Sequence, residues 1–222
     1  AYLRSLETDV ALLQEASYSG GVSAEQHIPV APWNIGPTRR WGSGITSTWP
    51  LRPLEEVVTR YGAHPFKPVP DNSYRGAVAI GVAEPPGLGR LAVISVYALM
   101  NPYYAQTTLL RVVADLIPVF DSKEFDNVVL GGDLNIHTQV KGPVLDRYRA
   151  ILHAIEALGL VNLFRTGREL RTPLANCPCS EPECYHARTH IHRAHKGQLA
   201  EITGGHNDYL FANAELANRL TS

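Results

Sequence analysis

The sequence predicts a mixed domain of the α/β or α+β class, in which strands and helices share one core. Apolar runs typical of buried strands occupy residues 10–13, 77–82, 91–97 and 128–130. Helical patterns of apolar residues separate or follow these runs. Mixed elements in this order favour an α/β or α+β domain over a helical bundle or an all-β sandwich.

Two amphipathic helices are predicted from the spacing of apolar residues. The first covers residues 109–117 and lies between the last two strand-like runs, which makes a strand, helix, strand unit. The second has an apolar face over residues 148–158, and Gly159 stands where a C-terminal cap is expected. A helix after each of these strands supports the mixed class.

The length and composition fit one globular domain over residues 1–222. The chain is 45% hydrophobic, which is enough for a large core. No run of about 18 consecutive apolar residues is present, so we expect a soluble protein without a membrane span. The formal net charge is −1, so nucleic-acid binding would need a local basic patch.

Two long segments lack clear strand or helix patterns. Residues 20–53 are rich in Gly, Pro, Trp and Ser, and residues 172–205 are polar with clustered Cys and His. Loops longer than about 15 residues are uncommon unless they are functional or disordered. Both segments are therefore predicted to be loops that build a substrate surface, the second as an insertion in the domain.

Two glycines, an acid and an amide follow the strand-like run at residues 128–130. Gly131 and Gly132 would let a ligand or another backbone approach closely. Asp133 and Asn135 would project to the same side of the strand end. The simpler alternative is an ordinary turn, because Asp and Asn are common turn residues.

A similar pattern occurs at two other places. Gln14 and Glu15 end the run at residues 10–13, and Asp208 precedes an apolar run at residues 209–211. A glutamate at a strand end is a hard oxygen ligand suited to Mg²⁺, which usually takes few protein carboxylates. A solvated strand terminus is the alternative for Glu15, but three such termini in one chain favour a shared site.

Four ordered motifs resemble those of the endonuclease/exonuclease/phosphatase superfamily. They occupy residues 12–15, 95–97, 131–135 and 207–211 and span nearly the whole chain. This DNase I-like superfamily includes pancreatic deoxyribonuclease, abasic-site endonucleases, neutral sphingomyelinases and inositol polyphosphate 5-phosphatases. The resemblance implies a four-layer αββα sandwich, with two β-sheets flanked by helices. It also implies hydrolysis of phosphate esters with Mg²⁺ or Mn²⁺, with nucleic acid favoured over lipid or sugar phosphates.

The resemblance assigns roles to five residues. Glu15 resembles the glutamate that binds Mg²⁺, and Asp133 resembles the acid that orients or deprotonates the attacking water. Asn135 would steady the phosphate, and Tyr97 would lie against the scissile phosphate. Asp208 resembles the acid that fixes the orientation of a catalytic histidine. Such residues supply water activation and charge stabilisation for phosphoester hydrolysis.

The resemblance also implies parts that are not found between Ala1 and Ser222. Relatives carry an Asn on a strand before the first helix and a Ser-Asp-His motif on a last strand. We therefore expect a chain truncated at both ends, and poor turnover by this fragment, since the histidine partner of Asp208 is missing. Residues 97–101 are one residue longer than the equivalent segment of abasic-site endonucleases, so Asn101 is given no role.

The polar loop contains a candidate zinc site. Cys177, Cys179 and Cys184 are the only cysteines of the chain, and His186 follows them closely. Thiolates and imidazoles are preferred ligands of tetrahedral Zn²⁺, which could order a loop with few apolar residues. A flexible His-rich loop or weakly packed thiols are the alternatives. The odd, crowded cysteines are unlike a disulfide scaffold, so we expect a cytoplasmic protein.

Four further residues are candidate substrate contacts. Arg39 and Arg40 could neutralise phosphate and Trp41 could stack on a base, while His206 lies next to the presumed site. Plain solvated loops are the alternative reading. The competing function is a nonenzymatic binding module on the same scaffold, with the zinc-ordered loop contacting nucleic acid or protein. The sequence gives no prediction of oligomeric state.

Overall fold

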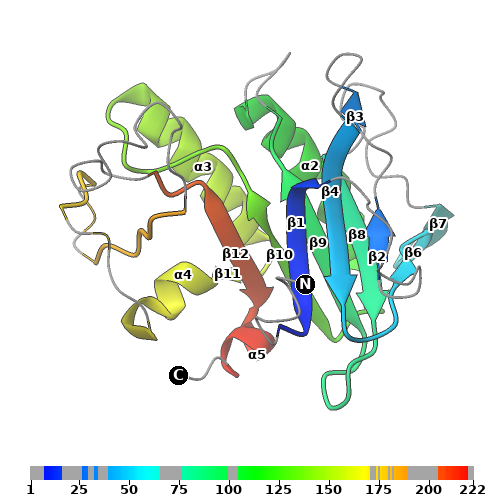
Figure 1. The fold of residues 1–222 in the computed structure, drawn as a ribbon. Helices are drawn as coiled ribbons and strands as arrows, with labels where there is room; N and C mark the ends of the chain where they lie inside the picture. Colours follow the sequence, from blue (N-terminus) through cyan, green and yellow to red (C-terminus); the bar gives the residue numbers. More distant parts are fainter. Residues whose placement is uncertain are drawn as a thin grey trace.

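Two facing β-sheets, one of them covered by helices, form the frame of the molecule (Figure 1). The structure is a computed structural model. It describes residues 8–16, 27–29, 33–34, 40–65, 77–99, 105–170, 174, 176–179, 181, 183–189 and 205–219.

The larger sheet has six strands. Their spatial order is β11 (Leu160–Asn162), β12 (Asp208–Asn213), β10 (Asn127–Asp133), β9 (Leu91–Tyr97), β8 (Val78–Ala83) and β5 (Arg52–Pro53). Only β9 and β10 are parallel, and helix α2 (Ala105–Asp121) makes the crossover that a parallel pair requires. The predicted strand, helix, strand unit is therefore confirmed.

The smaller sheet is antiparallel and centred on β4 (Arg40–Ser47). Its other strands are β1 (Val10–Ala16), β2 (His27–Pro29) and β3 (Trp33–Asn34). A separate hairpin joins β6 (Glu56–Thr59) to β7 (Gly62–Pro65).

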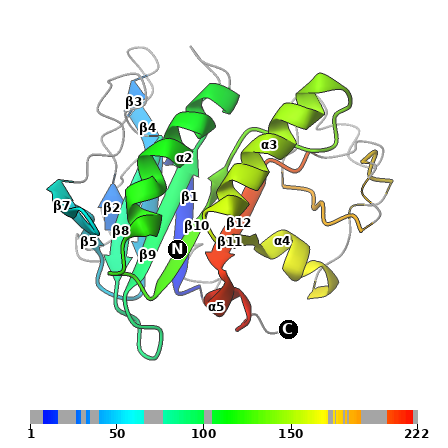
Figure 2. The ribbon, with the colours of Figure 1, turned by 180° about the vertical axis from the view of Figure 1, so that it is seen from behind.

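Helices α2 and α3 (Pro143–Ala157) cover one face of the six-stranded sheet (Figure 2). Alternate residues of β9 serve the two faces: Ile94 belongs to the cluster under the helices, whereas Val93 packs with Ile45 of the smaller sheet. Burial on both faces explains why this strand is apolar without alternation. The remaining helical segments are short: α4 (Leu163–Thr166), the 3-10 turn η3 (Arg168–Leu170) and α5 (Ala214–Ala217).

The expected mixed class and both long helices are confirmed. Gly159 follows α3 with φ 88°, and its N–H donates to the carbonyl of Glu156 at 2.9 Å, as expected of a C-terminal cap. Helices α2 and α3 form one layer, and the two sheets form two more. The predicted fourth layer, a second layer of helices, falls outside the described residues. Within the described part of the chain, no helix is long and apolar enough to span a membrane.

The prediction of one long loop over residues 20–53 is wrong. This segment contains β2, β3, β4 and β5. Its glycines suggested a loop, but Gly42 and Gly44 lie in β4 opposite Ala16 and Leu13 of β1. Ile45, the residue after Gly44, is fully buried where the two sheets pack together. Glycine therefore lies inside this strand and does not end it.

Candidate active site

Three neighbouring strands place polar side chains in one row. Asp133, the last residue of β10, pairs with Tyr97 at the end of β9 on one side. It pairs with Asp208, the first residue of β12, on the other side. In Figure 1, β10 and its neighbours bring this row to the edge toward which the β10 arrow points. The two aspartates and the tyrosine are thus brought together as the sequence predicted.

Glu15 reaches the same row from the smaller sheet. The Tyr97 hydroxyl donates to Glu15 Oε1 at 2.8 Å, which joins the two sheets at the site. The pairing of β1 with β4 is irregular between Leu13 and Ala16, and Glu15 has φ 52°. Such bulges re-aim side chains, and left-handed backbone at a non-glycine residue is concentrated at functional sites. The irregularity turns an exposed glutamate toward Tyr97.

A partly buried polar contact fixes Gln14, the residue of β1 next to Glu15. Gln14 Nε2 donates to Ser95 Oγ at 2.9 Å, and Ser95 Oγ donates to the carbonyl of Leu13 at 3.2 Å. Ser95 is completely buried in the apolar strand β9. Buried hydroxyls need partners, so these bonds tie β1 to β9 just before the site. The serine within an apolar run is a sequence signal that could have indicated this contact, which was not predicted.

Gly131 and Gly132 let β1 and the strands beside β10 come close. A Cβ on Gly132 would overlap the carbonyl oxygen of Val96 and lie 2.7 Å from Gln14 Nε2. A Cβ on Gly131 would lie 2.7 Å from the carbonyl oxygen of Tyr209. The glycines are therefore needed for the approach of neighbouring backbone, one of the two reasons that the sequence suggested.

Asn135 is fixed by two hydrogen bonds beside Asp133. Its backbone N–H donates to Asp133 Oδ1 at 2.9 Å, and its Nδ2 donates to the carbonyl of Ala98 at 2.9 Å. Its φ of 48° is left-handed, a conformation that Asn tolerates better than most residues. The turn considered as an alternative from the sequence is thus present, and it holds the Asp133 carboxyl in place.

Negative charge is concentrated at the row. Burial raises the pKa of Asp133 to about 7, the N–H of Asn135 lowers it in part, and the nearby Asp208 and Glu15 carboxylates raise it. The pKa of the Tyr97 hydroxyl is also raised, first by burial and then by its hydrogen bond to Glu15. Like charges held close together disfavour ionisation of the most buried member.

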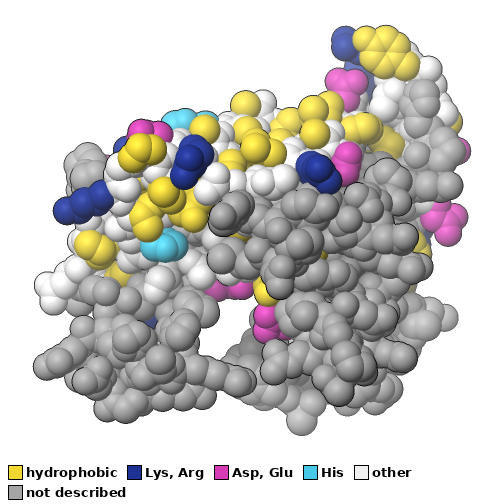
Figure 3. Space-filling view, turned by 90° about the horizontal axis from the view of Figure 1, so that it is seen from above, with side chains coloured by type: hydrophobic (Ala, Val, Ile, Leu, Met, Phe, Trp, Pro, Cys, Tyr) yellow, Lys and Arg dark blue, Asp and Glu magenta, His cyan; other side chains and the backbone are white. Residues whose placement is uncertain are grey.

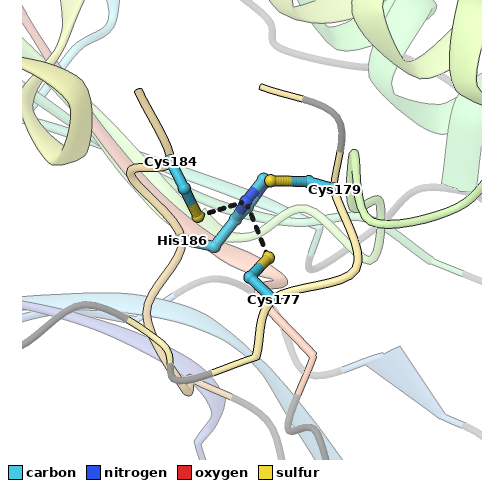
Figure 4. Close-up of side chains that lie close together, drawn as sticks. All are labelled: Cys177, Cys179, Cys184 and His186. Atoms are coloured by element: carbon cyan, nitrogen blue, oxygen red, sulfur yellow. Dashed lines mark hydrogen bonds between the residues drawn. The ribbon is translucent and has the colours of Figure 1, made fainter. Parts of the chain in front are cut away.

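The Cys/His cluster is a second grouping of functional side chains. One ligand atom from each of Cys177, Cys179, Cys184 and His186 lies within 4.8 Å of every other (Figure 4). His186 Nδ1 lies 3.4 Å from both Cys177 Sγ and Cys184 Sγ. His186 is completely buried. The structure therefore brings together all four residues of the predicted metal set.

Comparisons with known proteins identify the architecture. No family model and no curated protein sequence matches the chain. Solved structures do: an AP endonuclease from Archaeoglobus fulgidus has 19% identity and a TM-score of 0.57, with 100% of this chain and 82% of that chain covered. The chain has the DNase I-like fold.

Two further DNase I-like structures agree over nearly the whole chain. The AP endonuclease LMAP from Leishmania major has 15% identity and a TM-score of 0.61, covering 98% of this chain and 73% of that chain. The 3′ phosphatase NExo from Neisseria, bound to a product DNA hairpin, has 16% identity and a TM-score of 0.60. That match covers 99% of this chain and 82% of the phosphatase.

The prediction that His206 contacts the substrate is wrong for this DNase I-like chain. His206 is completely buried. Its ring packs edge-on against Phe164 and Tyr209, with ring centroids 4.8 and 4.6 Å away, and its Nδ1 accepts from the N–H of Ala187 at 3.1 Å. Closeness to Asp208 in sequence was misleading, because Tyr185 and Ala187 of the Cys/His loop contact His206 and help to bury it.

The other predicted substrate contacts remain expectations. Arg39 lies outside the described residues, and Arg40 and Trp41 begin β4, opposite Asn34 and Trp33. Figure 3 views the end of the DNase I-like fold toward which β10 runs. Among the coloured side chains in this view, hydrophobic groups gather along one margin and Lys and Arg are scattered. No continuous basic patch forms among the described residues of this face.

Sequence reasoning missed two residues that connect the loop to the row. Thr189 Oγ1 accepts from the N–H groups of Asn207 and Asp208 at 2.9 and 3.1 Å. Gln139 Oε1 accepts from the N–H of His206 at 3.0 Å. Neither residue lies in a motif, and no signal in the sequence identified them, because both act through contacts distant along the chain.

Proposed function

We propose that the protein is a divalent-cation-dependent phosphoesterase that hydrolyses phosphate esters of nucleic acid. The observation that carries the proposal is the convergence of Glu15, Tyr97, Asp133 and Asp208 at adjoining ends of two sheets. The similar structures include AP endonucleases and a 3′ phosphatase bound to DNA. These names support a nucleic-acid substrate over lipid or sugar phosphates.

The residues of the row fit a hard divalent cation. Glu15 offers an exposed carboxylate that Tyr97 orients through a 2.8 Å hydrogen bond. The pKa of Asp133 is raised by burial and by the nearby negative charge of Asp208 and Glu15, and a bound cation would offset that charge. Glu15 would hold Mg²⁺ or Mn²⁺, and the bound ion would offset charge on the phosphoryl oxygens.

Asp133 is proposed as the residue that orients and deprotonates the attacking water. A general base works best when its pKa is near the working pH, and burial raises the pKa of Asp133 to about 7. The N–H of Asn135 donates to Asp133 Oδ1, and Asp133 Oδ2 does not accept that hydrogen bond. The Asn135 amide and the Tyr97 hydroxyl are proposed to contact the phosphate. Asp208 keeps its proposed role of orienting a histidine.

Replacing Glu15 with Gln is expected to weaken cation-dependent hydrolysis by at least about 100-fold at limiting Mg²⁺, because a neutral amide binds the cation more weakly. The measurement is hydrolysis of bis(p-nitrophenyl) phosphate by the full-length protein in Mg²⁺, Mn²⁺ or EDTA. Raising the cation concentration should restore part of the rate.

Glu56→Gln is the matched control, since Glu56 is an exposed glutamate on the β6–β7 hairpin. This variant should keep the rate and the cation dependence of the unaltered protein. Equal rates in the Glu15→Gln and Glu56→Gln proteins would remove Glu15 from the proposed site.

A further inference from the structure

We propose that Cys177, Cys179, Cys184 and His186 bind one structural zinc ion, which fastens the loop to the strand that begins with Asp208. The four ligand atoms lie within 4.8 Å of one another. With Zn–S near 2.3 Å and Zn–N near 2.0 Å, a tetrahedral ion places sulfur and nitrogen ligands about 3.5 Å apart. The two observed distances from His186 Nδ1 to sulfur are 3.4 Å, close to that spacing.

The surroundings of His186 favour Nδ1 as a metal ligand. Its Nε2 lies 2.6 Å from Thr138 Oγ1, and both residues are buried. A histidine that binds a metal usually donates its other N–H to such an oxygen, which fixes the tautomer and the ring orientation. Nδ1 then has one lone pair facing the sulfurs of Cys177 and Cys184. An ion between them satisfies the nitrogen and the sulfurs together.

Few apolar side chains order the described part of the loop, and its ion pairs Arg149–Glu181 and Arg168–Glu183 are partly exposed. Within its described residues from 174 to 189, Leu174 and Tyr185 are the buried hydrophobic side chains. Gln139 Nε2 donates to Cys177 Sγ at 3.5 Å, a contact suited to a metal-bound thiolate. A polar loop that lacks an apolar core can be held by metal–ligand bonds, because binding energy then becomes folding energy.

Two hydrogen-bond connections lead from the cluster to the start of β12. Gln139 bridges Cys177 Sγ and the N–H of His206. Three residues after His186, Thr189 Oγ1 accepts from the N–H groups of Asn207 and Asp208. The zinc ion therefore holds the residue before Asp208 and the backbone of Asp208 itself. A catalytic role for the start of β12 rests on the proposed function. The zinc site does not depend on that function.

Metal content tests the site directly. The protein, produced without a His tag under reducing conditions, is expected to contain about one zinc ion per chain by elemental analysis. Exchange with Co²⁺ should give the absorption spectrum of a tetrahedral thiolate complex. Absence of near-stoichiometric zinc, or a disulfide among the three cysteines detected by mass spectrometry, would overturn the proposal.

Two single variants locate the ion. His186→Asn should lose the zinc, whereas His153→Asn, which changes an exposed histidine on α3, should retain it. If His186→Asn fails to fold, titration of the unaltered protein with a thiol-reactive mercurial decides the matter. Zinc should be released in step with modification of the three thiols, and release without thiol modification would contradict the ligand set.

Hydrogen exchange tests the connection to β12 without any use of activity. Removing zinc should speed exchange of the Asn207 and Asp208 amides by about tenfold or more, since two hydrogen bonds to Thr189 are then lost. Thr189→Val should speed the same amides while the zinc is retained. Unchanged exchange after the metal has left would refute the connection. These readouts can fail while hydrolysis persists, or succeed while hydrolysis is absent.

Discussion

Replacing Asp133 with Asn is expected to abolish hydrolysis and at the same time to stabilise the cation-free protein. Asn keeps the shape of the side chain but cannot accept a proton, so the rate should fall by about 1,000-fold. Asn also removes a buried carboxylate whose like-charged neighbours are Asp208 and Glu15. A residue that the proposed hydrolysis requires would thus destabilise the fold.

The stability gain should depend on pH. Burial raises the folded-state pKa of Asp133 from 3.8 to about 7, so the folded protein binds more protons than the unfolded chain between these values. The contribution of the Asp133 carboxyl to folding stability is therefore highest below about pH 4. This contribution is lost as the pH rises to about 7. The total loss is on the order of 4 kcal/mol, from about 1.4 kcal/mol per pKa unit.

Urea unfolding in EDTA at pH 5 and pH 8 measures this effect. The Asp133→Asn protein should lose less stability between the two values than the unaltered protein. Asp146→Asn, which changes an exposed aspartate in the first turn of α3, should leave the pH dependence as it was. An equal pH dependence in the Asp133→Asn protein would show that this carboxyl titrates in the ordinary range.

Replacing Gly132 with Ala is expected to cost at least about 4 kcal/mol of unfolding free energy. The added Cβ would overlap the carbonyl oxygen of Val96, which is backbone and cannot move without disturbing β9. The φ of 135° is also unfavourable for any residue with a side chain. Tyr97 follows Val96 directly in the chain, and Asp133 follows Gly132 directly. The substitution should therefore displace the row of polar side chains too.

Gly62→Ala separates the two causes. Gly62 has a similar φ of 114°, but nothing lies within 4 Å of an added Cβ. This control should lose only about 1–2 kcal/mol, the cost of the backbone conformation. Urea unfolding of both variants gives the comparison, and equal losses would contradict the close packing of β10 against β9.

The main strands and the motif residues could be predicted because they depend on local sequence. The apolar runs that became β8, β9 and β10 are buried on both faces, so they carry a continuous signal. The family resemblance assigned Asp133 and Tyr97 to one site, and the structure pairs them at the ends of two parallel strands. The grouping of the three cysteines with His186 could also be predicted, because these residues lie close together in the sequence.

Other features depend on contacts that the local sequence does not encode. The composition of residues 20–53 resembled that of a loop, although Gly42 and Gly44 lie in β4 and pair with β1. His206 resembled a site residue, although the Cys/His loop buries it. The irregular pairing that turns Glu15 toward Tyr97 follows from the meeting of two sheets. Each of these needs the register or the packing of distant segments, which a single sequence leaves open.

Incubation of the full-length protein with an end-labelled DNA duplex carrying an abasic site tests the central claim most directly. Binding and cleavage are followed in parallel, with Mg²⁺ or with EDTA. We predict cleavage only with the cation, and an Asp133→Asn protein that still binds the DNA but leaves it intact. Binding without cleavage in any divalent cation would contradict the account and favour a nonenzymatic binding module.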